Sequence, residues 1–275
     1  MNVAAHSMRD LPASAKARSR TSPRAFSRVG KDALLSESWF GERPCLLKPA
    51  LPARLTPHSP RGVRGSCLVN RRVDGIDAYL DRLASAGPTP GGGSAATVVG
   101  ALGSALCAMV ARITAASRRH EAVRPQAGAL AEAADALRER FSAARLLDEE
   151  AFGRVVTAQA LPAASPQQKA ARTEALQAAL VEAAEAPLAA AGLSAEGFEL
   201  AERAAALDNR QLVSDVACAV LFFRAAFSAS VANVRINHRF LADPATIRTQ
   251  DERLTAIGSA AAESEKRILT LLAKG

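Results

Sequence analysis

From Val73 to the C-terminus, the sequence is a succession of alanine-rich stretches divided by proline, glycine and helix-capping residues. The 203 residues of this part contain 54 alanines. Alanine favours the helix because its side chain loses no rotamer freedom there. Runs of Val, Ile and Thr with the two-residue period of a strand are absent, which argues against a large sheet. The sequence therefore predicts an all-α fold.

Start and stop signals divide this part into about seven helices with short connections, which predicts an up-and-down bundle. Ser165 with Pro166 and Gln168 forms a capping box that starts one of them, and Pro187 is expected to kink that helix near its end. Asp243-Pro244 starts the last one. The expected helices are 76–83, 94–119, 123–160, 166–191, 195–206, 208–240 and 244–272.

The formal net charge of +8 is concentrated at the N-terminus. Residues 1–72 hold 14 Lys and Arg against 4 Asp and Glu, whereas the rest holds 21 against 23, and half of the 14 prolines also fall in 1–72. We expect a disordered segment over 1–72 and one folded domain over 73–275. An organelle transit peptide, or a translation start placed too far upstream, would also account for the basic segment.

Nucleic acid and membranes are not expected as partners, because the part from Val73 onward is slightly acidic. Its longest apolar run, Pro88 to Ala111, is rich in small residues and glycine. The four cysteines show no CxxC spacing, and His120 and His238 are isolated, so we expect neither disulfides nor a metal site. A reducing, cytoplasmic location follows from this cysteine usage. The four cysteines are Cys45, Cys67, Cys107 and Cys218.

The most distinctive local motif is the turn Pro90-Gly91-Gly92-Gly93-Ser94. Glycines allow close approach of a ligand, and the helix that follows presents free N–H groups and the positive end of its dipole. The turn therefore suits a carboxylate or a developing anion, although a flexible turn capped by Ser94 fits the same residues. The small residues behind it recur on two helical rows, which indicates close helix packing. These rows are Ala96, Gly100, Ser104 and Ala108, and Gly103, Cys107 and Ala111.

Asp148 lies beside the apolar stripe of a long expected helix, in the run Leu147-Asp148-Glu149-Glu150-Ala151-Phe152. If this helix is antiparallel to the one that starts at Ser94, the level of Ser94 is reached about 25 residues into it, near residue 147. Asp148 would then face the glycine turn and could act as a general base. A partner N–H group or an arginine on a solvated face explains the residue equally well.

A later helix carries Ser214-Asp215 and, 18 residues beyond Asp215, Asn233. Eighteen residues are five turns, so Asp215 and Asn233 share a face but lie roughly 27 Å apart along the axis. They cannot serve one site within a subunit if the helix is unbroken. Either one of them is structural, or a dimer brings the two ends together.

Taken together, these segments resemble the cyclodeaminase/cyclohydrolase family of one-carbon metabolism. The resemblance extends from about Val73 to the C-terminus and rests on the order and spacing of the PGGGS turn, the Asp148–Pro162 stretch, Lys169–Leu188, Leu212–Val216 and Asn233–Asn237. The chain departs from the family pattern at three places. Leu146 stands where many members have a second acid, Asp208-Asn209 replaces Gly-Asn, and Ser228-Ala229 replaces Gly-Ala.

The resemblance implies an all-helical homodimer that binds a folate and uses neither a metal nor a redox cofactor. The family's catalytic aspartate, in the pattern D-x-x-A-F, falls on Asp148. The substrate would be held by Gly91, Gly92, Gly93 and Ser94, and by Ser214, Asp215 and Asn233 from the partner subunit.

The expected activity is that of a methenyltetrahydrofolate cyclohydrolase, which opens the 5,10-methenyl ring to the 10-formyl product. A formiminotetrahydrofolate cyclodeaminase that releases ammonia is the enzymatic alternative. The absence of a formiminotransferase domain in the chain favours the cyclohydrolase. A catalytically inactive helical oligomerisation module is the alternative of a different class.

Overall fold

The computed structural model describes residues 75–273, so the disorder expected for 1–72 lies outside the described residues. Six α-helices and two short 3-10 helices make up this part, and it contains no strand. The all-α fold expected from the sequence is thereby confirmed. The elements are α2 (Ile76–Leu83), α3 (Gly92–Ala116), η4 (Arg118–Val123), α4 (Arg124–Gln159), α5 (Pro166–Ala206), η5 (Arg210–Leu212), α6 (Val213–His238) and α7 (Pro244–Ala273).

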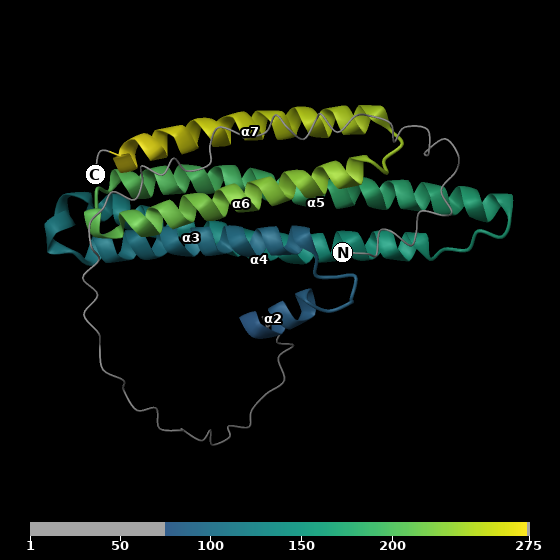
Figure 1. Ribbon diagram of the computed structural model, residues 1–275, viewed down its shortest axis with the longest axis horizontal. Helices are drawn as coiled ribbons and strands as arrows, with labels where there is room; N and C mark the ends of the chain where they lie inside the picture. Colours follow the sequence, from purple (N-terminus) through teal and green to yellow (C-terminus); the bar gives the residue numbers. More distant parts are fainter. Residues whose placement is uncertain (1–74, 274–275) are drawn as a thin grey trace, which may run out of the picture. The chain divides into compact units, whose positions relative to one another are not determined.

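Helices α3, α4, α5 and α6 form an antiparallel four-helix core, and α7 lies along α5 and α6 on its outside (Figure 1). In the core each helix contacts the next, and α6 closes the arrangement by packing against α3. Ion pairs fix the register of α4 against α5: Arg140 binds Glu196, and Arg154 binds Glu182. In two antiparallel helices, residues at the same level have residue numbers with a constant sum. Both ion pairs give the same sum, and by this sum Asp148 lies level with Leu188 of α5.

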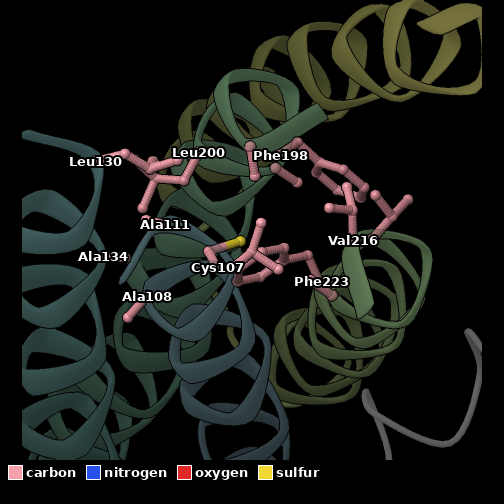
Figure 2. Packing of buried hydrophobic residues seen from close by; sticks show 14 of the residues in the cluster. Cys107, Ala108, Ala111, Leu130, Ala134, Phe198, Leu200, Val216 and Phe223 are labelled. Atoms are coloured by element: carbon pink, nitrogen blue, oxygen red, sulfur yellow. The ribbon is translucent and has the colours of Figure 1, made fainter. Parts of the chain in front are cut away.

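Three phenylalanines fill the centre of the core beside small side chains of α3, and Figure 2 shows two of them, Phe198 and Phe223, with Cys107, Ala108 and Ala111 of α3. The ring centroid of Phe223 lies 6.5 Å from that of Phe141 and 6.2 Å from that of Phe198. A Cβ atom on Gly100 would lie 2.4 Å from the Phe141 ring. The small-residue rows of α3 are buried, as expected from the sequence, because they make room for these rings.

The helix starts follow the capping signals. Ser165 accepts the backbone N–H of Gln168, and the Gln168 side chain accepts the Ser165 N–H, which completes the capping box of α5. Before α7, the Asp243 carboxylate accepts the N–H groups of Ala245 at 3.0 Å and of Thr246 at 3.1 Å. Each cap satisfies N–H groups that have no partner within the helix.

The break expected between residues 191 and 195 does not exist, because α5 runs without interruption from Pro166 to Ala206. Ala191, Leu193 and Ser194 are buried there, so packing on neighbouring helices outweighs the low helix propensity of Gly192. The bundle therefore has six α-helices in its described part where the sequence predicts about seven.

Pro187 lies inside α5, and another helix compensates for its missing N–H. In a regular helix, the N–H of residue 187 would bind the carbonyl of Ala183, and proline cannot supply it. The Asn237 side chain of α6 donates to that carbonyl at 2.6 Å. Asn237 is thus explained by the proline, and the hydrogen bond ties α6 to α5 at this level.

Three helical segments are long and apolar enough, by length and composition alone, to cross a membrane: Gly92–Ala116, Pro166–Ala206 and Arg210–His238. In α3 and α5, 56% of the most apolar window is buried against other parts of the chain, whereas the corresponding share for α6 is 28%. Much of the apolar surface of α6 is therefore uncovered in a single chain.

Candidate active site

The candidate site forms where the glycine turn leads into α3. The turn includes a cis peptide bond between Thr89 and Pro90, and Gly91 is the residue before the helix. Gly91 has no side chain to cap the helix, and the first intrahelical bond is made by the N–H of Ala95. The amino end of α3 therefore presents N–H groups that have no partner within the helix.

Asp148 of α4 supplies such a partner. Its carboxylate accepts the backbone N–H of Ser94 and thus caps α3 from a neighbouring helix. The approach is so close that a Cβ atom on Gly93 would lie 2.1 Å from Asp148 Oδ1. Gly93 must therefore lack a side chain if the carboxylate is to reach the helix end. The two residues lie level with one another, as the helix register predicted.

The surroundings of Asp148 favour its protonated form. Burial raises the pKa of the carboxyl group, the hydrogen bond from the Ser94 N–H lowers it, and the negative charge of Glu149 raises it again; the result is a pKa of about 6. Burial dominates because transfer from water penalises the charged form. A carboxylate with this pKa can both take up and release a proton near neutral pH.

Glu149, the next residue of α4, binds the same serine by its side chain. The Ser94 hydroxyl donates to Glu149 Oε1 at 2.9 Å, and the Tyr79 hydroxyl lies 2.9 Å from Ser94 Oγ. Arg145 binds Glu149 Oε1 at 2.8 Å, and Arg82 lies 3.7 Å from Oε2. The two carboxylates therefore differ: Glu149 accepts from the Ser94 hydroxyl and from Arg145, whereas the hydrogen-bond donor at Asp148 is the Ser94 backbone N–H.

Asn233 of α6 also belongs to this end of the bundle. A Cβ atom on Gly92 would lie 3.5 Å from Asn233 Nδ2 and 3.7 Å from Oδ1. The amide nitrogen donates to the Ala229 carbonyl at 2.8 Å, one turn back along α6. Its oxygen accepts no hydrogen bond from any residue that the structure describes. It is available to a ligand beside the glycine turn.

Ser214 and Asp215 lie at the other end of α6, because the helix is unbroken from Val213 to His238. That end is close to the carboxyl end of α3, where Asn209 donates to the Thr114 hydroxyl at 3.0 Å. Within one chain, the structure therefore brings together Gly91–Ser94, Asp148 and Asn233, and it separates Ser214 and Asp215 from them.

Sequence reasoning did not single out Tyr79, Arg82, Arg145 or Glu149 as site residues. In the sequence, Tyr79 is one of the apolar positions of a short amphipathic helix, and Glu149 is one of three consecutive acidic residues. A usable signal was the i, i+4 spacing of Arg145 and Glu149 on a helix already expected to face the turn. Among residues 75–273, no group of three or more His, Cys, Asp or Glu side chains could hold a metal ion.

Comparisons with known proteins agree on one family. Residues 75–256 match the family model described as formiminotransferase-cyclodeaminase. The chain is 35% identical over 193 residues to a methenyltetrahydrofolate cyclohydrolase of Methylorubrum extorquens, covering 70% of this chain and 93% of that protein. It is 27% identical over 168 residues to the formimidoyltransferase-cyclodeaminase of Rattus norvegicus, covering 61% of this chain but 31% of that protein.

The fold also matches a solved structure. The crystal structure of formiminotetrahydrofolate cyclodeaminase from Thermotoga maritima superposes with a TM-score of 0.65 at 28% identity. The match covers 73% of this chain and 96% of that one.

Proposed function

Because the chain belongs to the formiminotransferase-cyclodeaminase family, we propose that it is a methenyltetrahydrofolate cyclohydrolase in which Asp148 is the general base. The observation that carries this proposal is the half-buried Asp148 carboxylate, with a pKa of about 6, held against the amino end of α3. The 35% identity to a cyclohydrolase over 93% of that protein's length supports the choice of reaction.

The proposed reaction passes through a tetrahedral carbon. It needs one group that accepts a proton when this carbon forms and donates it when the carbon breaks down. Asp148 removes a proton from water as the water oxygen bonds to the amidinium carbon between N5 and N10. The same carboxyl group then gives the proton to N5 as the C–N5 bond breaks. The new hydroxyl group loses its proton to solvent, which leaves the formyl group on N10. A pKa near the working pH allows both steps.

The neighbouring groups are suited to orienting such a substrate. The glycines of the turn allow a flat ring to approach the backbone, and the Asn233 oxygen offers a hydrogen-bond acceptor beside Gly92. The N–H groups at the start of α3 favour partial negative charge on the substrate. We assign the ring and its reacting bridge to this end of the bundle.

The test is hydrolysis of 5,10-methenyltetrahydrofolate by the purified full-length chain, followed as the loss of its near-ultraviolet absorption. The proposal expects a rate above that of buffer, and it expects Asp148→Asn to abolish the increase. A wild-type rate equal to that of buffer would contradict the cyclohydrolase and favour an inactive helical module.

The cyclodeaminase reaction is the second candidate, favoured by the likeness to the Thermotoga maritima and Rattus norvegicus proteins. It closes the same ring from the formimino compound and expels ammonia, so Asp148 could serve it as well. Ammonia release from 5-formiminotetrahydrofolate separates the two reactions. A cyclohydrolase without this second activity leaves the formimino compound unchanged.

We further propose that the protein works as a homodimer that pairs through the uncovered face of α6. Its exposed positions are mostly small or apolar, and exposed Leu102 and Met109 of the adjacent α3 extend the surface. The exposed positions on this α6 face are Cys218, Leu221, Ala225, Ser228 and Ala232. Their alternate spacing of three and four residues is typical of a helix that packs against another helix.

The order of residues along α6 suits antiparallel pairing with a second copy. With the twofold axis at Ala225, Cys218 would face Ala232 of the other copy, and Asp215 would face Arg235. Arg235 makes no ion pair with any residue in the described part of the chain. Such pairing brings Ser214 and Asp215 of one subunit to the level of Asn233 in the other. This would supply the two residues that a single chain leaves far from Asp148.

Sedimentation velocity tests the pairing. Leu221→Asp should convert dimer to monomer, because it places a charge in the middle of the apolar face. Arg235→Asp should weaken the dimer, and the double variant Asp215→Arg/Arg235→Asp should restore it. Arg248→Asp, a charge reversal on the exposed side of α7, is the control that should leave the dimer intact. A wild-type monomer would contradict the proposal.

A further inference from the structure

Asp148 and Glu149 bind two different atoms of one residue. Asp148 accepts the backbone N–H of Ser94, and Glu149 Oε1 accepts the Ser94 hydroxyl at 2.9 Å. Ser94 is fully buried between them. Any movement of Glu149 would therefore displace the residue to which the Asp148 carboxylate is bound.

The hydrogen bonds around Ser94 have a defined direction. A serine hydroxyl has one hydrogen, and here it is given to the Glu149 carboxylate. In the 2.9 Å contact with Ser94 Oγ, Tyr79 must then be the donor. Burial raises the pKa of Tyr79, which keeps its hydroxyl protonated for this role. The chain of donors runs from Tyr79 through Ser94 to Glu149.

Tyr79 is also the residue that attaches α2 to the bundle. Its side chain is 6% exposed, whereas Ile76 and Leu80 on the same short helix are 60% and 51% exposed. The guanidinium groups of Arg145 and Arg82 lie 5.6 and 5.9 Å from the centre of its ring. These arginines bind Glu149 as well, so ring, hydroxyl and carboxylate form one closed cluster.

From this cluster we propose that Glu149 is a positioning residue, which holds Asp148 at the amino end of α3 through the Ser94 hydroxyl and fastens α2 beside the site through Tyr79. The inference rests on the proposed function, in which Asp148 is the reacting group. Glu149 itself needs no contact with the substrate. Its effect depends on one hydrogen bond to a buried hydroxyl and on its charge beside Asp148.

The groups packed around Asp148 and its neighbour Glu149 come from five helices. On α4 they are Glu149 and Arg145, and on α2 they are Tyr79 and Arg82. Helix α3 contributes its free N–H groups, α6 contributes the neutral Asn233 beside Gly92, and α5 is apolar at this level. Glu149 is therefore the negatively charged neighbour of Asp148 in this set.

Two substitutions at Glu149 separate the hydrogen bond from the charge. Glu149→Leu removes both and should lower kcat about ten- to a hundred-fold, because misplacing a reacting group by up to about 1 Å has effects of this size. Glu149→Gln keeps an acceptor for Ser94 and should recover most of that loss. In both variants the acid limb of the pH profile should move to lower pH, because the negative neighbour of Asp148 is gone.

Glu150→Leu is the matched control, since Glu150 is the next residue of α4 and its side chain is exposed. It should leave kcat and the acid limb unchanged. Ser94→Ala keeps the backbone N–H and removes only the hydroxyl, so it should reproduce the kcat loss of Glu149→Leu. Tyr79→Phe should lower kcat several-fold in the wild-type chain and have no further effect on Ser94→Ala, because the two act through one chain of hydrogen bonds.

A second readout does not depend on catalysis. The chain contains one tyrosine, so labelling with 3-fluorotyrosine gives a single fluorine resonance that reports on Tyr79. In Glu149→Leu and Ser94→Ala, this resonance should move toward its position in unfolded protein, and in Glu150→Leu it should stay. An inactive wild type would contradict the proposed function. An active wild type whose Glu149→Leu variant keeps its kcat, acid limb and fluorine resonance would overturn the positioning role.

Discussion

The amino ends of α3 and α7 are both capped by an aspartate, but the two carboxylates have opposite electrostatic properties. Asp243 precedes α7 in the chain and is exposed. The Thr246 hydroxyl and the N–H groups of Ala245 and Thr246 lower its pKa. Asp148 reaches α3 from another helix, and burial raises its pKa to about 6 despite the bond from Ser94.

This comparison shows that a hydrogen bond to a helix end does not by itself decide what a carboxylate does. In water, the N–H groups and the helix dipole stabilise the charge, and the carboxylate is a cap. Inside the bundle, the loss of hydration outweighs the same interaction, and the carboxylate becomes able to exchange a proton near neutral pH. The difference between α3 and α7 is thus the difference between a proposed active site and a structural feature.

The largest expected effect comes from removing the ionisable group at each helix end. Asp148→Asn should lower the cyclohydrolase rate by at least about 100-fold, the lower range for loss of a general base. The amide can still accept the Ser94 N–H, so the fold should persist. Asp243→Asn, the same change at the exposed end, should keep the wild-type rate. Steady-state assays of hydrolysis measure the rates of both variants. Similar rates would contradict the proposed difference between Asp148 and Asp243.

The next effect tests the close approach that only α3 requires. Gly93→Ala places a methyl group where Asp148 Oδ1 lies, so the carboxylate or the helix must move. We expect a loss of about 1–3 kcal/mol in the free energy of unfolding and roughly a hundred-fold loss of rate. Gly128→Ala is the matched control, because a Cβ atom there meets nothing within 4 Å. It should stabilise α4 by about 0.5–1 kcal/mol. Urea unfolding followed by circular dichroism measures both.

The pH dependence of stability should have opposite signs at the two ends. Asp148 binds protons more tightly when folded, so its contribution falls as the pH rises from 3.8 to about 6. Asp148→Asn should therefore raise the free energy of unfolding at pH 8, by at most about 3 kcal/mol for a shift of this size, and have little effect at pH 4.

Asp243 has a lowered pKa, so its contribution is present at neutral pH and is lost as the pH falls. Asp243→Asn should therefore destabilise the protein at pH 8 and lose this effect in acid. Urea titrations of both variants across this range give the two slopes, and slopes of the same sign would contradict the comparison.

The smallest effect comes from making α3 resemble α7. Gly91→Ser places a hydroxyl at the position before α3, where a Cβ atom meets nothing within 4 Å and the backbone is extended. The hydroxyl would compete with Asp148 for the first N–H groups. Stability should rise by roughly 0.3 kcal/mol, the small gain typical of serine over glycine at this position. The cyclohydrolase rate should fall several-fold, and a rate increase would show that Asp148 does not need this contact.

The level of Asp148 opposite the glycine turn could be predicted from the sequence because helices have a constant rise per residue. Two helices joined by a short connection are antiparallel, so counting residues from Ser94 to the turn and back is sufficient. The same regularity predicts that Asp215 and Asn233 lie at opposite ends of α6. Both positions could be predicted because they depend on backbone geometry alone.

The contacts of Glu149 and the continuity of α5 could not be predicted in this way, because they depend on packing between helices. In the sequence, Glu149 and Glu150 are equivalent acids, and only the position of Tyr79 and Ser94 distinguishes them. Gly192 and Pro187 are both unfavourable in a helix, yet burial of Leu193 and the Asn237 side chain compensate for them. Each case needs a partner from another helix that the local sequence does not reveal.

The hydrogen bond from Asn237 to the Ala183 carbonyl favours one alignment of α6 along α5. If α6 slid along α5 by one turn, this buried carbonyl would lose its donor, at a cost of about 1–3 kcal/mol. Apolar faces made of alanine and valine tolerate such sliding, because their side chains are similar from turn to turn. A proline that removes one donor therefore turns a permissive interface into one with a single favourable alignment. In that alignment Asn233, one turn before Asn237, comes to lie beside Gly92.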